Sequence, residues 1–213
     1  IGLLLLSCSL CMSCVQTDKK KALIDDDFLV AEQHLSNQLK AVPEPTVYPR
    51  TTGKDGKLIA TPKNDWTEGF YPGCLWYIYE HNREENWKQS AIKWTEALEP
   101  MKKLTSHHDI GFLIYCSFGN AYRLTGKEEY KDVIIEAANS LTTRFSEVTG
   151  CIKSWNYRKA WNGKDEWFYP VIIDNMMNLE LLYFASKVTG DTRYAKIATT
   201  HAETTAKNQL RKD

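Results

Sequence analysis

The feature that most constrains the fold is a unit that recurs along the chain: an apolar helix, a tight turn, and an amphipathic helix. The segment Leu124-Thr-Gly-Lys-Glu-Glu-Tyr130 matches Val188-Thr-Gly-Asp-Thr-Arg-Tyr194, and His81-Asn-Arg-Glu-Glu-Asn-Trp87 is a weaker copy. A single helical hairpin cannot bury its apolar helix, so neighbouring hairpins must stack. We therefore predict an all-α fold of stacked αα-hairpins with an inner apolar layer, either an α-solenoid or a closed α/α toroid.

Hydrophobic periodicity sets the expected boundaries of the helices. A turn-rich connection is expected over residues 43–64, and Pro100 is expected to end or kink a helix early. A long irregular loop over residues 149–172 carries Trp155, Trp161 and Trp167, and loops of this length are usually functional or disordered. Three indoles argue against disorder. The expected helices cover residues 22–42, 72–79, 84–104, 109–124, 127–145, 174–188 and 191–210.

The first 21 residues differ from the rest of the chain and resemble the end of a secretory signal. Cys8 or Cys14 follows small residues, as in a bacterial lipoprotein acylation site. We therefore expect residues 1–21 to be a signal remnant and residues 22–213 the folded domain. The expected location is the bacterial periplasm, free or lipid-anchored at the membrane that faces it. Cys8, Cys11 and Cys14 could suggest an iron–sulfur cluster, but they lie on the export segment without a fourth cysteine nearby.

Composition excludes several classes of function. The formal net charge is zero and no basic stripe occurs, so a nucleic acid is not an expected partner. No interior run of about 18 apolar residues exists, so no spanning segment is expected. Phosphate-binding and dinucleotide-binding motifs do not occur, and no cofactor is expected. We predict that Cys74, Cys116 and Cys151 are small buried hydrophobic residues rather than a disulfide framework.

Two aspartates stand where inner helices are expected to begin. Asp174 follows an apolar run, and Asp109 follows His107 and His108. Equivalent ends of stacked inner helices lie on one rim, so these side chains and Trp66 should converge there. Paired carboxylates with nearby indoles favour a carbohydrate site, although each aspartate alone is also explained as a helix cap. No metal is expected, because adjacent helical side chains point about 100° apart.

Three motifs resemble one enzyme family. They are Asp65-Trp-Thr-Glu-Gly-Phe-Tyr-Pro-Gly-Cys-Leu-Trp76, His107-His-Asp-Ile-Gly-Phe112 and Ile172-Ile-Asp-Asn-Met-Met-Asn-Leu179. In this order and spacing they resemble the unsaturated glucuronyl hydrolases of glycoside hydrolase family 88, over roughly residues 25–213. The resemblance implies an (α/α)6 barrel. Because such a barrel needs about 300 residues or more, the chain is expected to be the N-terminal part of one.

The resemblance also implies a reaction. Family members act on lyase-generated oligosaccharides that end in a Δ4,5-unsaturated uronic acid, and they hydrate the C4=C5 vinyl ether. By the match, Asp174 protonates C4 and helps a water molecule to add at C5, while Asp109 holds substrate hydroxyls and influences the proton balance of Asp174. Trp66 and Trp155 would stack on the unsaturated ring, and His108 would contact it.

Alternatives remain open from the sequence. One is an unsaturated rhamnogalacturonyl hydrolase with the same barrel, although the intact His-His-Asp-Ile-Gly-Phe motif favours the glucuronyl type. Another is a non-catalytic α-solenoid that binds a glycan or a partner, and a third is a structural helical domain with capping aspartates. Trp161 and Trp167 lie in a segment that varies in the family, so the resemblance implies no role for them.

Overall fold

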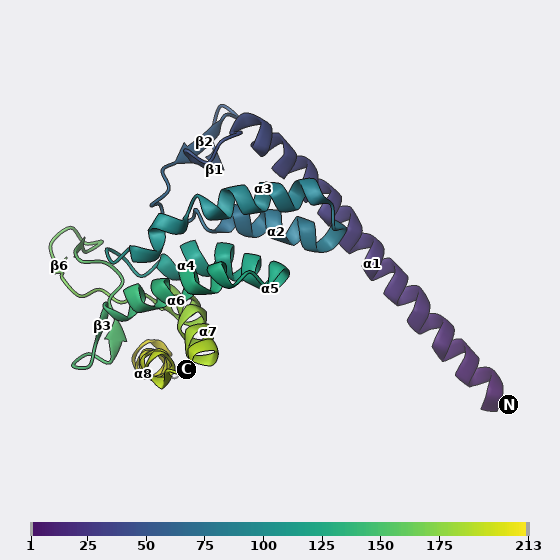
Figure 1. Cartoon of the computed structure of the whole chain (residues 1–213). Helices are drawn as coiled ribbons and strands as arrows, with labels where there is room; N and C mark the ends of the chain where they lie inside the picture. The colour runs from purple at the N-terminus through teal and green to yellow at the C-terminus, as the bar shows by residue number, and fades with distance from the viewer. Residues whose placement is uncertain (1, 212–213) are drawn as a thin grey trace. The chain divides into compact units, whose positions relative to one another are not determined.

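The computed structural model describes residues 2–211, with side chains from residue 19 onward, and its contacts divide the chain after Pro43 into two units. The first unit is one helix, α1 (Gly2–Ala41) (Figure 1). It ends just before Pro43, as predicted for residues 22–42. In the described part of the chain, every helix is too short or too polar to cross a membrane. The side chains of Cys8, Cys11 and Cys14, on which the acylation prediction rests, lie outside the described ones.

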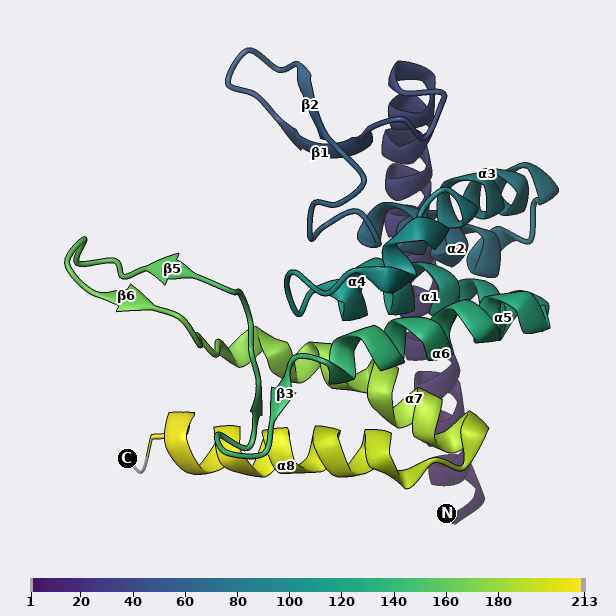
Figure 2. The ribbon, with the colours of Figure 1, turned by 60° about the vertical axis from the view of Figure 1, so that its left-hand side comes forward.

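The second unit contains the other predicted helices, which are interrupted by short 3₁₀ and π-helical segments (Figure 2). The expected helix over 84–104 is divided near Pro100 into α3 and the 3₁₀ segment η1, which confirms the predicted effect of this proline. The expected helix over 109–124 contains one π turn, η2. The elements are α2 (Phe70–Asn82), α3 (Glu85–Glu96), η1 (Glu99–Lys103), α4 (Ile110–Ile114), η2 (Tyr115–Gly119), α5 (Asn120–Thr125), α6 (Glu128–Thr142), η3 (Ile173–Asn178), α7 (Leu179–Thr189) and α8 (Thr192–Gln209).

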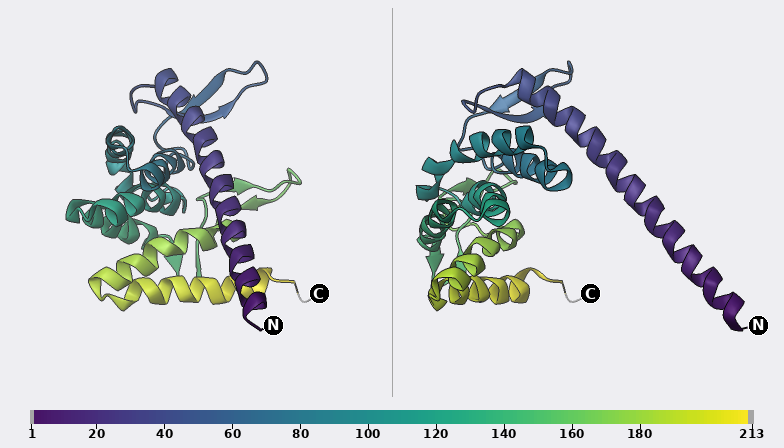
Figure 3. Two further views of the ribbon diagram at one scale, coloured as in Figure 1. Left: turned by 90° about the vertical axis from the view of Figure 1, so that its right-hand side faces the viewer. Right: turned by 45° about the vertical axis from the view of Figure 1, so that its right-hand side comes forward.

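These helices form stacked hairpins (Figures 2 and 3). Helix α2 pairs with α3, the α4–η2–α5 run pairs with α6, and α7 pairs with α8; between hairpins, α2 contacts η2 and α4 contacts α7. The all-α prediction of stacked αα-hairpins is confirmed. Gly126 and Gly190 adopt the left-handed backbone that ends α5 and α7, with φ of 67° and 75°. After α2 the same position and conformation are occupied by Arg83, at φ 61°. This turn is the weaker sequence copy because it has an arginine where the other two have a glycine.

The core lies between the two helical layers. Trp76 and Trp94 are fully buried, and Trp87 is nearly so. The indole N–H of Trp76 donates to the Thr95 hydroxyl at 2.9 Å, which satisfies its polar edge inside the core. These three indoles are therefore part of the hydrophobic core. Of the cysteines, Cys151 is buried and Cys116 half-buried, but Cys74 is exposed, so the prediction of a buried thiol was wrong there.

Short antiparallel ribbons occupy the connections, and the sequence did not predict them. Strands of two to five residues are too short to show an alternating pattern that stands out from a turn. The connection over 43–64 contains one ribbon, and the supposedly irregular loop over 149–172 contains parts of two. The pairs are β1 (Tyr48–Thr52) with β2 (Leu58–Thr61), β3 (Phe145–Ser146) with β4 (Cys151–Ile152), and β5 (Arg158–Lys159) with β6 (Glu166–Trp167).

Glycines allow the inner helices to approach closely at the ends where the aspartates lie. A Cβ on Gly69, just before α2, would stand 2.0 Å from the carbonyl oxygen of Phe112 in α4. A Cβ on Gly111 would stand 2.3 Å from Oδ1 of Asn178 in η3. Real Cβ atoms do not make such contacts, so both seams require glycine. They draw the starts of the three inner helical segments together.

Candidate active site

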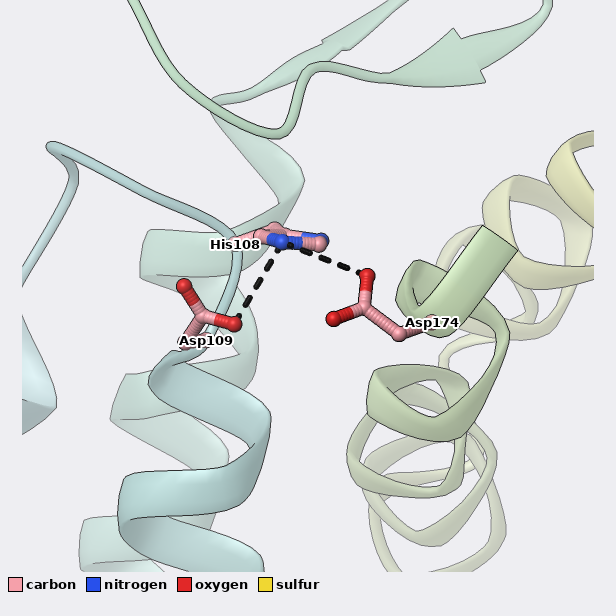
Figure 4. A group of neighbouring side chains, drawn as sticks. All are labelled: His108, Asp109 and Asp174. Carbon is pink, nitrogen blue, oxygen red and sulfur yellow. Dashed lines mark ion pairs between the residues drawn. The ribbon is translucent and has the colours of Figure 1, made fainter. Parts of the chain in front are cut away.

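The centre of the site is His108, whose ring lies between two carboxylates (Figure 4). Its Nε2 is 3.3 Å from Oδ1 of Asp109 and 3.7 Å from Oδ1 of Asp174. His107 completes the group, with its Nδ1 3.0 Å from Oδ2 of Asp109. The His108 side chain is fully buried, and that of Asp174 is 37% exposed. The cluster is therefore closed behind the histidine and open to solvent at Asp174.

Local backbone structure aims the two carboxylates at each other. Asp109 stands at the N-cap position of α4 but makes no capping hydrogen bond through its side chain, so the cap explanation is wrong for this residue. Asp174 does not open an α-helix, as the sequence suggested. It lies inside the 3₁₀ segment η3, whose N-cap is Ile172, and α7 begins only at Leu179. Both side chains are thereby directed toward His108 (Figure 4).

Burial and neighbouring charge set the protonation of the cluster. Burial raises the pKa of Asp174, and the Asp109 charge raises it further, while His108 and backbone N–H groups act in the opposite direction. Burial lowers the pKa of His108 against the opposite pull of the two carboxylates. Asp174 thus holds a proton to higher pH than an ordinary aspartate does, beside an imidazole that favours its neutral form. This is the arrangement expected of a general acid.

Two buried amides hold the segment that carries Asp174. The backbone N–H of Phe112 donates to Oδ1 of Asn178 at 2.9 Å, across the Gly111 seam. Nδ2 of Asn175 donates to the carbonyl of Ile152 at 2.8 Å, which leaves its Oδ1 available to the His108 ring. Asn178 thereby satisfies a free N–H in the first turn of α4. The Asp109 and Asp174 segments are joined by this bond.

The segment over 152–156 closes the other side of the histidine. The backbone N–H of His108 donates to the Ser154 carbonyl at 3.0 Å, and His107 pairs with Trp155 as an isolated β-bridge. The Trp155 ring stands edge-on to the His108 ring, with 5.9 Å between centroids. Buried Arg144 fastens this segment: its guanidinium donates to the carbonyls of Thr105 and Lys153 and to Oδ1 of Asn156.

Trp66 lies farther along the same rim. Its ring packs on Phe112 at 6.1 Å between centroids and edge-on to Phe70 at 6.2 Å. The guanidinium of Arg50 lies 5.2 Å above it. The indole is 43% exposed, so one face is available to a ligand. Trp66 joins the histidine–aspartate cluster through Phe112, three residues after Asp109.

The structure brings together His108, Asp109, Asp174 and Trp155, as the sequence predicted, with Trp66 at the edge.

The structure also shows that the reason given for excluding a metal was wrong. His108 and Asp109 precede α4 in a turn, so helical spacing does not separate them, and one ligand atom from each of His108, Asp109 and Asp174 lies within 4.8 Å of the others. The group has donor atoms suited to a cation, and the expectation of a metal-free site stays a prediction.

Sequence reasoning missed the residues that support the site. Asn175 and Asn178 are amides in an otherwise apolar helix start, and a buried amide must be hydrogen-bonded. Gly111 is a glycine in the first turn of a helix, where another residue would be more favourable unless space is short. The sequence therefore indicated that these residues have a structural role, but it did not predict which residues they contact. Those contacts lie as many as 66 residues away along the chain.

Comparisons with known proteins identify the family. The chain is 44% identical over 168 residues to an unsaturated glucuronyl hydrolase of Formosa agariphila, covering 78% of this chain and 41% of that relative. It is 36% identical over 157 residues to an unsaturated chondroitin disaccharide hydrolase of Streptococcus agalactiae, covering 70% and 37%. A solved structure of an unsaturated glucuronyl hydrolase specific for heparin matches with a TM-score of 0.80 at 39% identity, covering 88% and 48%. The chain is related to the unsaturated glucuronyl hydrolase family over the matched residues.

The relationship extends over one part of these proteins. This chain spans about two fifths of the length of the curated relatives and about half of the matched solved chain. No family model matches it. The stacked hairpins correspond to part of an α/α barrel, which decides between the solenoid and the toroid in favour of the toroid.

Proposed function

We propose that residues 22–213 form the N-terminal part of the catalytic barrel of an unsaturated glucuronyl hydrolase. The proposed substrates are oligosaccharides whose non-reducing end is a Δ4,5-unsaturated uronic acid. The observation that carries the proposal is the geometry at His108, where a solvent-accessible carboxyl of raised pKa faces a second, buried carboxylate. The names of the curated relatives support the choice of substrate class.

In the proposed reaction, protonated Asp174 gives its proton to C4 of the vinyl ether. Positive charge then develops at C5, a water molecule forms a bond to C5, and the water proton returns to the Asp174 carboxylate. The resulting hemiketal opens and releases the shortened sugar and a keto-uronate. Asp109 keeps Asp174 protonated by electrostatic repulsion and binds sugar hydroxyls. His108 contacts the ring, and Trp155 and Trp66 stack against it.

The test follows the ultraviolet absorbance of the C4=C5 bond in unsaturated chondroitin and heparin disaccharides, using the protein expressed from its complete gene. The expected result is loss of absorbance, which Asp174→Asn abolishes. Asp132→Asn is the matched control, because Asp132 is exposed on the outer helix α6. No loss of absorbance with any unsaturated uronide would refute the proposal.

The same experiment, extended by a rhamnogalacturonan-derived unsaturated substrate and a binding measurement, separates the other readings. A rhamnogalacturonyl hydrolase would consume only the rhamnogalacturonan-derived substrate. A non-catalytic glycan-binding domain would bind disaccharides without loss of absorbance, and Asp174→Asn would leave that binding largely intact. The relatives found in the comparisons carry glucuronyl and chondroitin disaccharide hydrolase names, which favours the first proposal.

We also propose that residues 1–21 direct export and that Cys8 or Cys14 carries a lipid. The support is the apolar run followed by small residues and cysteines. Metabolic labelling with a radioactive fatty acid should mark the protein in its bacterial host. Cys8→Ser or Cys14→Ser should remove the label, whereas Cys74→Ser should not. A protein unlabelled before any substitution would refute the anchor.

A further inference from the structure

The ribbon beside the site carries a cation held by two indoles. Arg158 begins β5, and its guanidinium carbon lies 4.6 Å from the Trp161 ring centroid and 5.2 Å from the Trp155 ring centroid. Arg158 is half-buried, and Trp161 is 80% exposed. The indoles therefore order the arginine at the surface, where its outer edge can receive a ligand.

Two other arginines that stack on aromatic rings are paired with carboxylates. Arg50 lies over Trp66 and pairs with Asp65 at 3.5 Å, and Arg193 lies over Tyr194 and pairs with Asp191 at 3.5 Å. Among the residues that the structure describes, no carboxylate pairs with Arg158. A guanidinium offers five N–H donors in a planar fork, and this one keeps its charge for an external anion.

The position of Arg158 connects it with the catalytic cluster. Trp155, on which it stacks, stands edge-on to His108. Arg158 is also the register partner of Trp167 in β6, and in-register residues place their side chains on the same face. Residues 166–172 line an open groove of about 460 Å³, and this segment ends two residues before Asp174. The groove is thus lined at one end by Trp167, the register partner of Arg158, and at the other by Ile172, two residues before Asp174.

We propose that Arg158, with Trp155 and Trp161, forms a subsite for an anionic group of the bound sugar, a carboxylate or a sulfate. This inference rests on the proposed function. Carboxylates and tetrahedral oxyanions can accept two parallel N–H bonds from a guanidinium, and such charge-assisted bonds are stronger than neutral ones. Arginine is also weakly hydrated and pre-ordered when it stacks on an aromatic face. Trp161 offers its exposed surface to the apolar face of the sugar beside that anion.

The experiment measures kcat and KM of the protein from its complete gene with an unsulfated and a sulfated unsaturated chondroitin disaccharide. Arg158→Gln should raise KM about tenfold or more, as expected for loss of a charge-assisted bond, with kcat changed less than twofold. Arg158→Lys should fall between, because lysine keeps the charge but not the fork. Arg83→Gln is the matched control: Arg83 also stacks on an aromatic ring, but beyond the end of α2 remote from the site.

The two substrates distinguish the sources of the anion. A KM increase with both disaccharides assigns the carboxylate of the uronate to Arg158, and an increase with the sulfated one alone assigns the sulfate. Turnover by the unmodified protein with unchanged KM in Arg158→Gln for both substrates overturns the subsite and leaves the proposed function standing. If the unmodified protein turns over neither of these substrates nor an unsaturated heparin disaccharide, the proposed function fails. Tryptophan fluorescence titration with the same sulfated disaccharide then decides the subsite: equal affinity in Arg158→Gln overturns it.

Discussion

Among the residues that the structure describes, two carboxyls have raised pKa values, and one of them, Asp174, lies in the candidate site. Glu68 is fully buried behind the β1–β2 ribbon, where the Thr61 hydroxyl donates to one oxygen and burial raises its pKa to about 7. Asp174 is partly open to solvent and faces His108 and Asp109. Burial raises both pKa values, but only Asp174 combines a held proton with access for a substrate. A perturbed pKa thus indicates an active site only together with an open face and a second polar group.

The largest expected effect separates the two carboxyls by activity. Asp174→Asn should lower kcat for an unsaturated disaccharide by about 10²–10⁴-fold, the usual contribution of a general acid. Glu68→Gln keeps the shape and hydrogen-bonding capacity of a neutral Glu68 and should change kcat less than threefold. Steady-state kinetics with circular dichroism as a folding control checks this. A large loss of kcat in a folded Glu68→Gln protein would mean that the comparison is wrong.

The next effect concerns the seam that holds Asp174. Gly111→Ala places a Cβ 2.3 Å from Oδ1 and 2.8 Å from Cα of Asn178, so η3 must move away from α4. Overpacking of this kind costs about 1–3 kcal/mol, and kcat should fall with it because Asp174 moves. Urea unfolding measures the first effect.

Glu68 supplies the reference for the seam variant, since it lies outside the Gly111–Asn178 contact. Its pKa should be the same in Gly111→Ala as in the unmodified protein, while that of Asp174 should change. Both can be followed by NMR of carboxyl carbons. Unchanged stability and activity in Gly111→Ala would show that the seam does not position the acid.

A smaller effect comes from the pH dependence of stability. The folded protein holds the Glu68 proton more tightly than the unfolded chain does, since the pKa rises from 4.5 to about 7. The unfolding free energy should therefore fall as the pH rises from about 4.5 to 7, by on the order of 1–3 kcal/mol. Glu68→Gln should remove this part of the pH dependence. Parallel pH profiles of the two proteins would contradict the buried proton.

The smallest expected effect tests the influence of one carboxylate on the other. Asp109→Asn removes a negative charge beside Asp174 and should lower the pKa of Asp174. The alkaline limb of any residual activity should shift to lower pH by the same amount. NMR titration of the Asp174 carboxyl measures the shift directly. A pKa that rises or stays constant would mean that burial alone sets the proton affinity of Asp174.

The elements that the sequence predicted well are those whose signals are local. The Thr125-Gly126 and Thr189-Gly190 turns, the apolar inner helices and the position of Pro100 depend on neighbours within a few residues. The convergence of Asp109 and Asp174 followed from their equivalent places at the starts of inner helices. These predictions needed the hairpin repeat but no knowledge of a particular distant contact.

The features that the sequence did not reveal depend on partners far along the chain. Gly111 is required by Asn178, and the burial of Glu68 depends on a ribbon formed before it. Asp174 was expected to begin an α-helix, but it lies in a 3₁₀ segment in which Asn175 donates to the Ile152 carbonyl and Asn178 accepts from the Phe112 N–H. The sequence did not distinguish Arg158 from the other charged residues. The structure places it against two indoles, with no carboxylate paired to it among the described residues.

The bond between Phe112 and Asn178 has a consequence for how the protein is made. Its two residues are 66 positions apart, and a ribosome adding 5–20 residues per second needs about 3–13 s to cover that distance. During this interval His108 and Asp109 have already been synthesised, but the segment that carries Asp174 and Asn178 has not. The first two hairpins can stack at once, whereas the acid–histidine cluster forms only when the third arrives. The moment at which Asp174 comes into contact with His108 is therefore the moment at which the third hairpin docks.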